Sequence, residues 1–229
     1  MTVRFYSSAD DMKISEKAFD ILCKEVKKRK KTNILISGGN SLKKFFSLIV
    51  RRRKNISNIN FVLSDERIVT EKSSYSNVSM IKKQLINKII KEKKPNFIYP
   101  SIINTNKTNK QICEEYNNKI KILPTIGFLG VGHDGHIASI FYKDTKTQYK
   151  NSSLLICKKK NEKFKRISIN IEYLINIPSL IIIVLGKNKS NILKNILDYK
   201  VQVSDMPILD LLCKSKGNIN ILYNKNISK

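Results

Sequence analysis

The sequence predicts an α/β protein with a single domain over residues 1–229, in which helices flank a mainly parallel sheet. Short β-type apolar runs alternate with stretches of helical spacing, which is typical of βαβ units. The length of 229 residues suits one sizeable core. An unbroken apolar run, Leu180–Leu185, fits a strand that is covered on both faces.

In the first 131 residues a helix is expected between each strand and the next. Asp10 is a candidate N-cap, and Ile14, Ala18 and Leu22 follow it at helical spacing. Strands are expected over 3–6, 33–36, 59–63, 97–99 and 125–131, and helices over about 10–26, 42–49, 77–90 and 111–120.

The remainder of the chain predicts more strands than helices. Ile167, Ile169 and Ile171 alternate with other residues, as in a strand with one buried face. Strands are expected over 154–157, 166–171, 179–185 and 219–223, and a helix over about 190–197.

The formal net charge of +26 has two readings. Lysines that neutralise phosphates release counterions, which would favour nucleic-acid binding. However, Lys, Asn and Ile are abundant in every segment, tryptophan is absent, and no aromatic residues are interleaved with the lysines to stack on bases. We therefore expect a composition bias that attracts anionic metabolites, and no specific nucleic-acid partner.

The sequence favours a cytoplasmic protein without a membrane partner. Its longest apolar run is far shorter than the roughly 20 residues of a membrane-spanning helix. Residues 1–5 are too short and too mixed for a secretory signal. The cysteines at 23, 113, 157 and 213 have no paired spacing and are interpreted as reduced thiols.

Three polar clusters follow predicted strands. Because ligands of open α/β sheets bind beyond the carboxyl ends of the strands, all three could face one crevice.

The first cluster, residues 37–41, reads Ser-Gly-Gly-Asn-Ser and leads into a helix. Its backbone N–H groups and the helix N-terminus could hold a phosphate, or the segment could be only a tight turn. No Gly-Lys-Ser/Thr follows, so it is not a Walker loop.

The second cluster, residues 64–67, reads Ser-Asp-Glu-Arg. Its acids could cap a following helix. Alternatively, it forms a charged site in which Arg67 binds an anion or a carbonyl oxygen, and Asp65 and Glu66 orient hydroxyls or other side chains.

The third cluster, residues 130–136, contains both histidines of the chain. Its glycines match the dinucleotide fingerprint, but Asp134 would lie beside the pyrophosphate and no acid follows the next strand. A zinc or iron site would need additional carboxylate or thiol ligands. In acid–base catalysis, His136 would accept a proton and Asp134 would orient it. A capping Asp beside a surface His would fit the same spacing.

The order and content of these motifs resemble the 6-phosphogluconolactonase family over nearly the whole chain. The most specific part is Asp134-Gly135-His136-x-Ala138-Ser139-x-Phe141. The other matching segments are Ser37-Gly38-Gly39, Asp65-Glu66-Arg67, Ser76-Asn77, Arg166-Ile167-Ser168, Gly186-x-x-Lys189 and Met206-Pro207.

This resemblance implies a Rossmann-like fold and hydrolysis of 6-phospho-D-glucono-1,5-lactone without a metal or organic cofactor. It implies that His136 is the general base, that Asp134 orients it, and that Arg67 stabilises the developing oxyanion or binds phosphate. Residues expected to bind the substrate or its phosphate are Ser37, Gly38, Gly39, Asn40, Asp65, Glu66, Asn77, Arg166 and Lys189.

Three further functions remain open. Glucosamine-6-phosphate deaminases share the fold, but usually have Asp-Glu-Tyr where this chain has Asp65-Glu66-Arg67, and Phe-Asn-Glu-Pro where it has residues 138–141. A catalytically inactive sugar-phosphate sensor and a basic binding protein are also compatible with the sequence. His133 stands where the family often has proline, and adds a second imidazole beside the site. We expect a monomer or a weak homodimer.

Overall fold

The core of the protein is a seven-stranded sheet in which every pair of neighbouring strands is parallel. The computed structural model describes residues 1–28, 30–52, 56–89, 91–102, 107–143, 145–198 and 206–227. The strand order is β1-β11-β10-β6-β2-β3-β5. Their bounds are Val3–Ser8 (β1), Thr32–Ile36 (β2), Ile59–Leu63 (β3), Asn96–Ile98 (β5), Ile126–Gly130 (β6), Ser179–Val184 (β10) and Asn218–Asn224 (β11).

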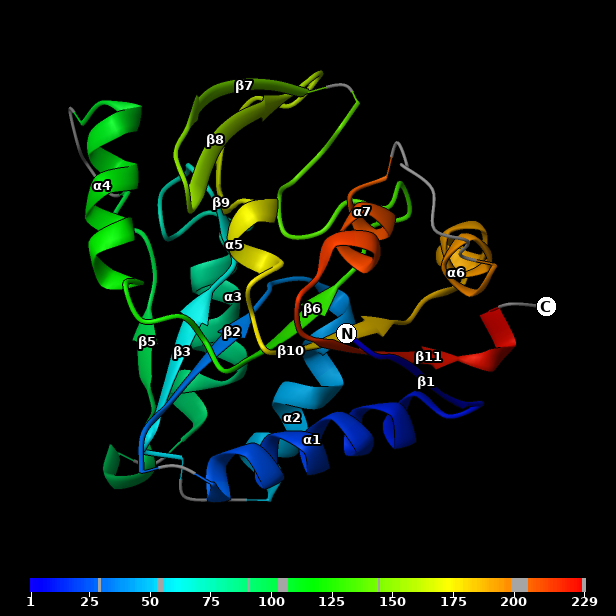
Figure 1. Ribbon diagram of the computed structural model, residues 1–229. Helices are drawn as coiled ribbons and strands as arrows, with labels where there is room; N and C mark the ends of the chain where they lie inside the picture. Colours follow the sequence, from blue (N-terminus) through cyan, green and yellow to red (C-terminus); the bar gives the residue numbers. More distant parts are fainter. Residues whose placement is uncertain are drawn as a thin grey trace.

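Helices cover both faces of this sheet (Figure 1). Side chains alternate between the faces of a strand, so Ile34 and Ile36 enter one core while Leu35 enters the other. The first core contains side chains of α1 (Asp11–Lys27), α2 (Lys43–Arg51) and α3 (Asn77–Gln84). The second contains side chains of α4 (Asn109–Lys119), α5 (Ile171–Leu174), α6 (Ser190–Leu197) and α7 (Pro207–Lys214). The predicted α/β fold class is confirmed.

The chain reverses its direction of travel across the sheet between β2 and β6. From β2 it proceeds to β3 and β5, whereas from β6 it proceeds to β10 and β11, on the other side. β2 and β6 are hydrogen-bonded neighbours, with Leu35 opposite Gly127. The loops that leave these two strands therefore diverge and leave a crevice at their carboxyl ends.

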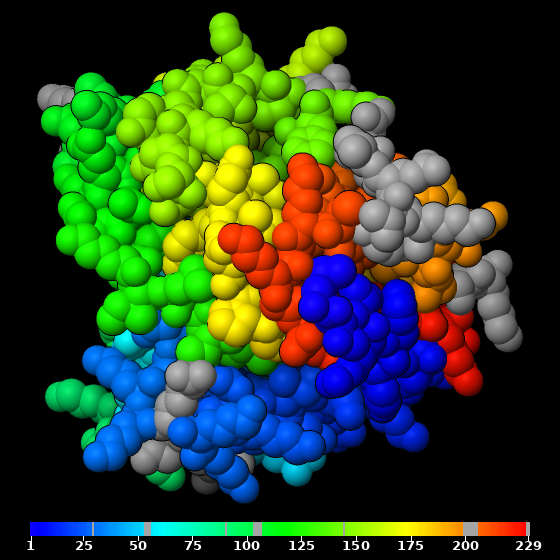
Figure 2. All heavy atoms as spheres, viewed as in Figure 1, coloured from blue at the N-terminus to red at the C-terminus, as the bar shows by residue number. Residues whose placement is uncertain are grey.

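The first and last strands of the described chain lie side by side at one edge of the sheet. β1 pairs with β11 over its whole length, from Val3 opposite Ile219 to Ser8 opposite Asn224. Figure 2 shows the N-terminal residues against the segment that leads into β11.

A second sheet, of four antiparallel strands, was not predicted from the sequence. Its order is β4 (Asp65–Arg67), β9 (Arg166–Ile169), β8 (Leu154–Lys159) and β7 (Thr145–Lys150). The strands expected over 154–157 and 166–171 exist, but they belong to this sheet. β7 was missed because its residues are polar and mostly exposed, and β4 because it is three charged residues long.

Some helices and strands of the parallel part and its connections also differ from expectation. The helix expected over 77–90 ends at Gln84, and residue 90 lies outside the described residues. The strand expected over 166–171 ends at Ile169, because the Asn170 side chain accepts a hydrogen bond from the backbone N–H of Tyr173 and begins α5. α7 was missed, although Pro207 at its first turn is a typical start signal.

The described residues also bear on the expected environment of the protein. None of their helices has the length and apolar character that crossing a membrane requires. All four cysteines are free thiols, as the sequence predicts, and those at 113 and 157 are buried.

Tyr116 connects α4 to the end of β3. Its side chain is 1% exposed, and its hydroxyl donates a hydrogen bond to the carbonyl of Leu63. Burial raises the pKa of Tyr116 well above its ordinary value, so the group stays a neutral donor. Because Leu63 precedes Ser64 and Asp65, this bond also anchors the start of the second polar cluster.

We expect Tyr116→Phe to lower the free energy of unfolding by about 1–2 kcal/mol, because a buried acceptor loses its donor. Chemical denaturation followed by circular dichroism measures this. Tyr149→Phe, on the partly exposed strand β7, is the matched control and should change stability much less. Equal stability of the two variants would contradict the role of the hydrogen bond.

Candidate active site

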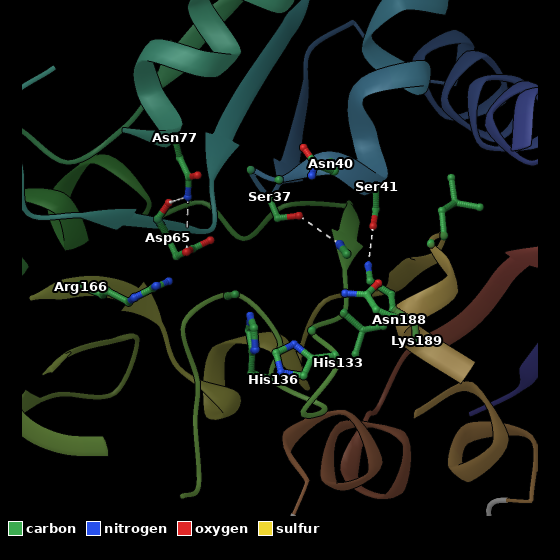
Figure 3. A pocket seen from close by; sticks show the side chains of 18 of the residues that line it. Ser37, Asn40, Ser41, Asp65, Asn77, His133, His136, Arg166, Asn188 and Lys189 are labelled. Carbon is green, nitrogen blue, oxygen red and sulfur yellow. Dashed lines mark hydrogen bonds between the residues drawn. The ribbon is translucent and has the colours of Figure 1, made fainter. Parts of the chain in front are cut away.

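A cavity of about 320 Å³ lies at the carboxyl ends of the central strands. It is lined by the turns after β2, β6 and β10, together with residues of β4, β9 and the start of α3. In Figure 3, Asp65, Asn77 and Arg166 lie on one side, Ser41, Asn188 and Lys189 on the other, and His136 between them. The three polar clusters predicted from the sequence therefore meet at one site.

The turn after β2 crosses the point where the sheet reverses. The Ser37 hydroxyl accepts a hydrogen bond from the backbone N–H of Gly130 at 3.0 Å, which ties the ends of β2 and β6 together. Gly39 has φ of 93°, a conformation that favours glycine. It leads directly into a 3-10 turn, Asn40–Leu42, and then α2. Gly38, Gly39 and Asn40 thus present backbone to the cavity at the start of a helical segment.

Lys189 lines the cavity next to this turn. Its ammonium donates to the Ser41 hydroxyl at 2.7 Å. No ion pair between described residues includes Lys189. Burial lowers the pKa of Lys189 to about 8. A half-buried cation that lacks a carboxylate partner within the described chain, beside a glycine turn, is suited to an anionic ligand.

The turn after β6 carries the Asp134–His136 pair. Nδ1 of His136 bonds to Oδ1 of Asp134, and the backbone N–H of His136 donates to the same oxygen at 3.3 Å. The backbone N–H of Gly132 donates to the carbonyl of His136 at 2.9 Å and closes the turn. His136 lines the cavity, as does His133, whereas Asp134 lies behind His136.

The charge of Asp134 is stabilised on several sides. Partial burial would raise its pKa, but the bonds and charge of His136 and the hydrogen bond from Lys159 lower the pKa of Asp134 well below its ordinary range. Lys159 donates to Oδ2 at 3.1 Å. The carboxylate therefore stays ionised and accepts from Nδ1, which leaves Nε2 of His136 available as a proton acceptor.

Gly132 is required where it stands. A Cβ at this position would collide with the His136 imidazole and the Asp134 carboxylate. At Gly130, the last residue of β6, a Cβ would meet Ser41 at an ordinary 3.4 Å. The backbone at Gly132 thus packs directly against the Asp134–His136 pair.

Asp65 is buried at the other side of the cavity, and hydrogen bonds fix its position. Its carboxylate accepts from the Ser64 hydroxyl at 2.8 Å and from the Ser139 hydroxyl at 2.7 Å. Its backbone carbonyl accepts from the Asn77 amide at 2.9 Å. Asp65 and Asn77 both line the cavity and are placed to meet polar groups of a ligand.

Glu66 does not line the cavity, although it was expected among the substrate-binding residues. Its side chain is 1% exposed and accepts from the backbone N–H groups of Arg67, Asn77 and Val78 and from the Ser76 hydroxyl. Burial raises the pKa of Glu66, and these backbone N–H groups oppose the rise. Glu66 thus joins β4 to the N-terminus of α3 instead of facing a ligand.

The two arginines at the site differ in their partners. Arg67 donates to the carbonyl of Tyr75 at 2.7 Å, while its buried Nε has no hydrogen-bond partner among the described residues. Arg166 forms two bonds with Glu162, at 2.8 and 2.6 Å, and its guanidinium lies over the rings of Phe141 and Phe164. Arg67 therefore forms no ion pair with a described residue, whereas the charge of Arg166 is already paired.

Sequence reasoning missed several residues around the cavity. Asn188 lines it, as does Ser41, which belongs to the first polar cluster but was not assigned a binding role. Ser139, Glu162 and Lys159 hold groups that line the cavity or lie directly behind it. Ser139 lies within a recognised motif. Lys159 and Glu162 come from the antiparallel sheet and its connections, and the rule that ligands bind beyond the ends of parallel strands does not point to them.

Among the described residues, no group of three or more His, Cys, Asp and Glu could hold a metal ion.

Comparison with known proteins identifies relatives over the whole fold. The 6-phosphogluconolactonase of Borreliella burgdorferi is 26% identical over an alignment of 230 residues, gaps included, which covers 97% of this chain and 96% of that protein. The structure of 6-phosphogluconolactonase from Leishmania guyanensis has a TM-score of 0.78 at 18% identity, over 100% of this chain and 98% of that one. A monomeric glucosamine-6-phosphate deaminase has a TM-score of 0.80 at 17% identity, over 100% and 99%.

The fold is therefore common to lactonases and a deaminase, and does not by itself separate the two activities. A sequence profile described as glucosamine-6-phosphate isomerases/6-phosphogluconolactonase matches residues 11–219. This match spans nearly the whole chain, and the chain belongs to the glucosamine-6-phosphate isomerase/6-phosphogluconolactonase family.

Proposed function

We propose that this protein is a 6-phosphogluconolactonase, which hydrolyses 6-phospho-D-glucono-1,5-lactone to 6-phospho-D-gluconate in the oxidative pentose phosphate pathway of the cytoplasm. The observation that carries the proposal is the shared cavity. It joins a carboxylate-oriented imidazole, His136, to Lys189, a cation that no carboxylate of the described residues neutralises. The names of curated relatives support the same activity, among them the proteins from Borreliella burgdorferi and Dictyostelium discoideum.

His136 is the general base in this mechanism. Asp134 holds Nδ1, so Nε2 takes a proton from a water molecule as the water attacks C1 of the lactone. The tetrahedral intermediate carries negative charge on the former carbonyl oxygen. When it collapses, the bond from C1 to the ring oxygen breaks, and the protonated His136 returns the proton to that oxygen. The products are the C1 carboxylic acid, which ionises, and a free hydroxyl.

Arg67 is the proposed donor to the developing oxyanion. Its side chain lines the cavity, and its guanidinium forms no ion pair with a described residue. A preorganised donor of this kind is worth more at a charge that develops in the transition state than at the neutral carbonyl.

The phosphate of the substrate is assigned to the Lys189 side of the cavity. There the ammonium, the Ser41 hydroxyl and the backbone of Gly38, Gly39 and Asn40 converge. Asp65, Asn77 and Arg166 line the opposite side and are assigned to the sugar hydroxyls. Arg166 was expected to bind phosphate, but its pairing with Glu162 makes it a weaker attractor of a dianion than Lys189.

The first test is hydrolysis of freshly prepared 6-phosphogluconolactone, coupled to 6-phosphogluconate dehydrogenase and corrected for the spontaneous rate. We expect acceleration that persists with a chelator, and a loss of turnover of about 100- to 10,000-fold in His136→Ala. Circular dichroism shows whether the variant is folded. A folded His136→Ala enzyme of unchanged rate would exclude His136 as the base. A wild-type protein that instead released ammonia from glucosamine 6-phosphate would make it a deaminase.

The pKa of Lys189, about 8, predicts how substrate binding depends on pH. Below this value the ammonium is present and attracts the phosphate; above it the charge is lost. The inhibition constant of the product, 6-phosphogluconate, should therefore rise roughly tenfold between about pH 7 and about pH 9. Lys189→Met should bind weakly at both values and lose this dependence. A pH dependence preserved in Lys189→Met would assign the effect to another group.

Gly132→Ala should disrupt the catalytic pair without unfolding the protein. The added methyl group displaces the His136 ring and the Asp134 carboxylate, and a shift of about 1 Å costs roughly 100-fold in turnover. Gly130→Ala is the control for the catalytic pair, because its methyl group makes an ordinary contact with Ser41 and none with the pair, and it should retain most of kcat. Kinetics of both variants, beside their melting temperatures, separate displacement of the pair from loss of the fold.

A further inference from the structure

The antiparallel sheet contributes a side chain that contacts the turn after β6, which carries Asp134 and His136. Lys159 is the last residue of β8, and its ammonium donates to Oδ2 of Asp134 at 3.1 Å. Oδ1 of the same carboxylate bonds to Nδ1 of His136. Asp134 therefore bridges a cation on β8 and the imidazole at the cavity, and each of its oxygens has one of these partners.

Phe141 reinforces this arrangement. The His136 ring packs on the Phe141 ring with centroids 4.6 Å apart. The ammonium of Lys159 lies 4.7 Å from the centre of the same ring. A cation over an aromatic face is attracted by the ring quadrupole. The side chains of Lys159 and His136 therefore both pack on the Phe141 ring.

We propose that Lys159 is a positioning residue for the reaction: it holds Asp134 in place and offsets the negative charge that Asp134 exerts on His136. The proposal rests on the proposed function of His136 as general base. A carboxylate beside an imidazole favours the protonated ring, which cannot accept a proton from water. An ammonium on the far oxygen of that carboxylate offsets part of the negative charge beside the ring.

Other charged and titratable groups also face the site. His133 belongs to the same turn as His136, and Asp65, Arg67, Arg166 and Lys189 line the cavity. Asp65 accepts from Ser139, Arg166 is paired with Glu162, and Lys189 donates to Ser41, so each of these three has a separate partner. Lys159 is the cation bonded to Asp134, and its influence on His136 is the most direct.

The neighbouring lysine provides a matched control. Successive side chains of a strand point to opposite faces, so Lys158 points away from the face that carries Lys159. Lys158 is exposed, whereas the side chain of Lys159 is 27% exposed. Lys158→Met thus removes one positive charge from the adjacent position without touching Asp134.

The kinetic experiment compares four variants by the pH dependence of kcat/KM. Lys159→Met removes both the charge and the hydrogen bond, Lys159→Gln removes only the charge, and Lys159→Arg keeps both. We expect the acidic limb to move to higher pH by about half a unit to one unit in Lys159→Met and Lys159→Gln. It should stay in place in Lys159→Arg and in Lys158→Met. Lys159→Met should also lose several-fold in kcat at the pH optimum.

A purely structural ion pair would give a different result. It would lower kcat or the melting temperature in Lys159→Met while leaving the acidic limb at the same pH in all four variants. That outcome would overturn the proposal. An equal shift in Lys158→Met would also overturn it, because the effect would then come from the net charge of the protein.

A second readout does not depend on activity. The chain has two histidines, so a His133→Gln background leaves the His136 ring as the one histidine signal in an NMR titration. In this background Lys159→Met should move the titration midpoint of His136 to higher pH, and Lys159→Arg should not. If the protein failed to hydrolyse the lactone but this shift occurred, the proposed function would fail and the electrostatic role of Lys159 would stand. Absence of the shift would refute that role.

Discussion

The reversal of the sheet between β2 and β6 is the constraint on which the site depends. Because the chain leaves these neighbours in opposite directions, their loops cannot pack on each other, and a cavity remains at their carboxyl ends. The hydrogen bond from Gly130 to the Ser37 hydroxyl joins the two strand ends across this point. The glycine turn and the Asp134–His136 turn therefore face one cavity, although about a hundred residues separate them in the sequence.

In a chain of net charge +26, carboxylate partners decide which cations at the cavity are left unpaired. Arg166 is neutralised by Glu162, and Lys159 by Asp134. Lys189 has no ion-pair partner among the described residues, and it donates to a neutral hydroxyl, that of Ser41. Under the proposed function, attraction for the anionic substrate depends on which cations are left without a carboxylate, more than on how many there are. The two paired cations, Arg166 and Lys159, both come from the antiparallel sheet.

Much of the fold and part of the site could be predicted from the sequence. Strand-helix alternation located every strand of the parallel sheet, because apolar runs at period two and helical spacing are local signals. The strand-end clusters pointed to Ser37, Asp65 and His136, all of which line the cavity. The antiparallel sheet was missed as a unit, because β4 and β7 are short or polar and are held by their partners instead of by their own apolar pattern.

The sequence by itself determined the alternation of elements, the cavity-facing turns and the residue types available for catalysis. Only the tertiary structure decided which charges neutralise one another. Asp65 and Glu66 are adjacent and chemically similar, yet one faces the cavity and the other caps α3, because neighbouring residues of β4 point to opposite sides. In the same way, the pairing of Lys159 with Asp134 joins residues 25 positions apart. Such pairings follow from how two sheets pack, and local sequence patterns carry no record of that packing.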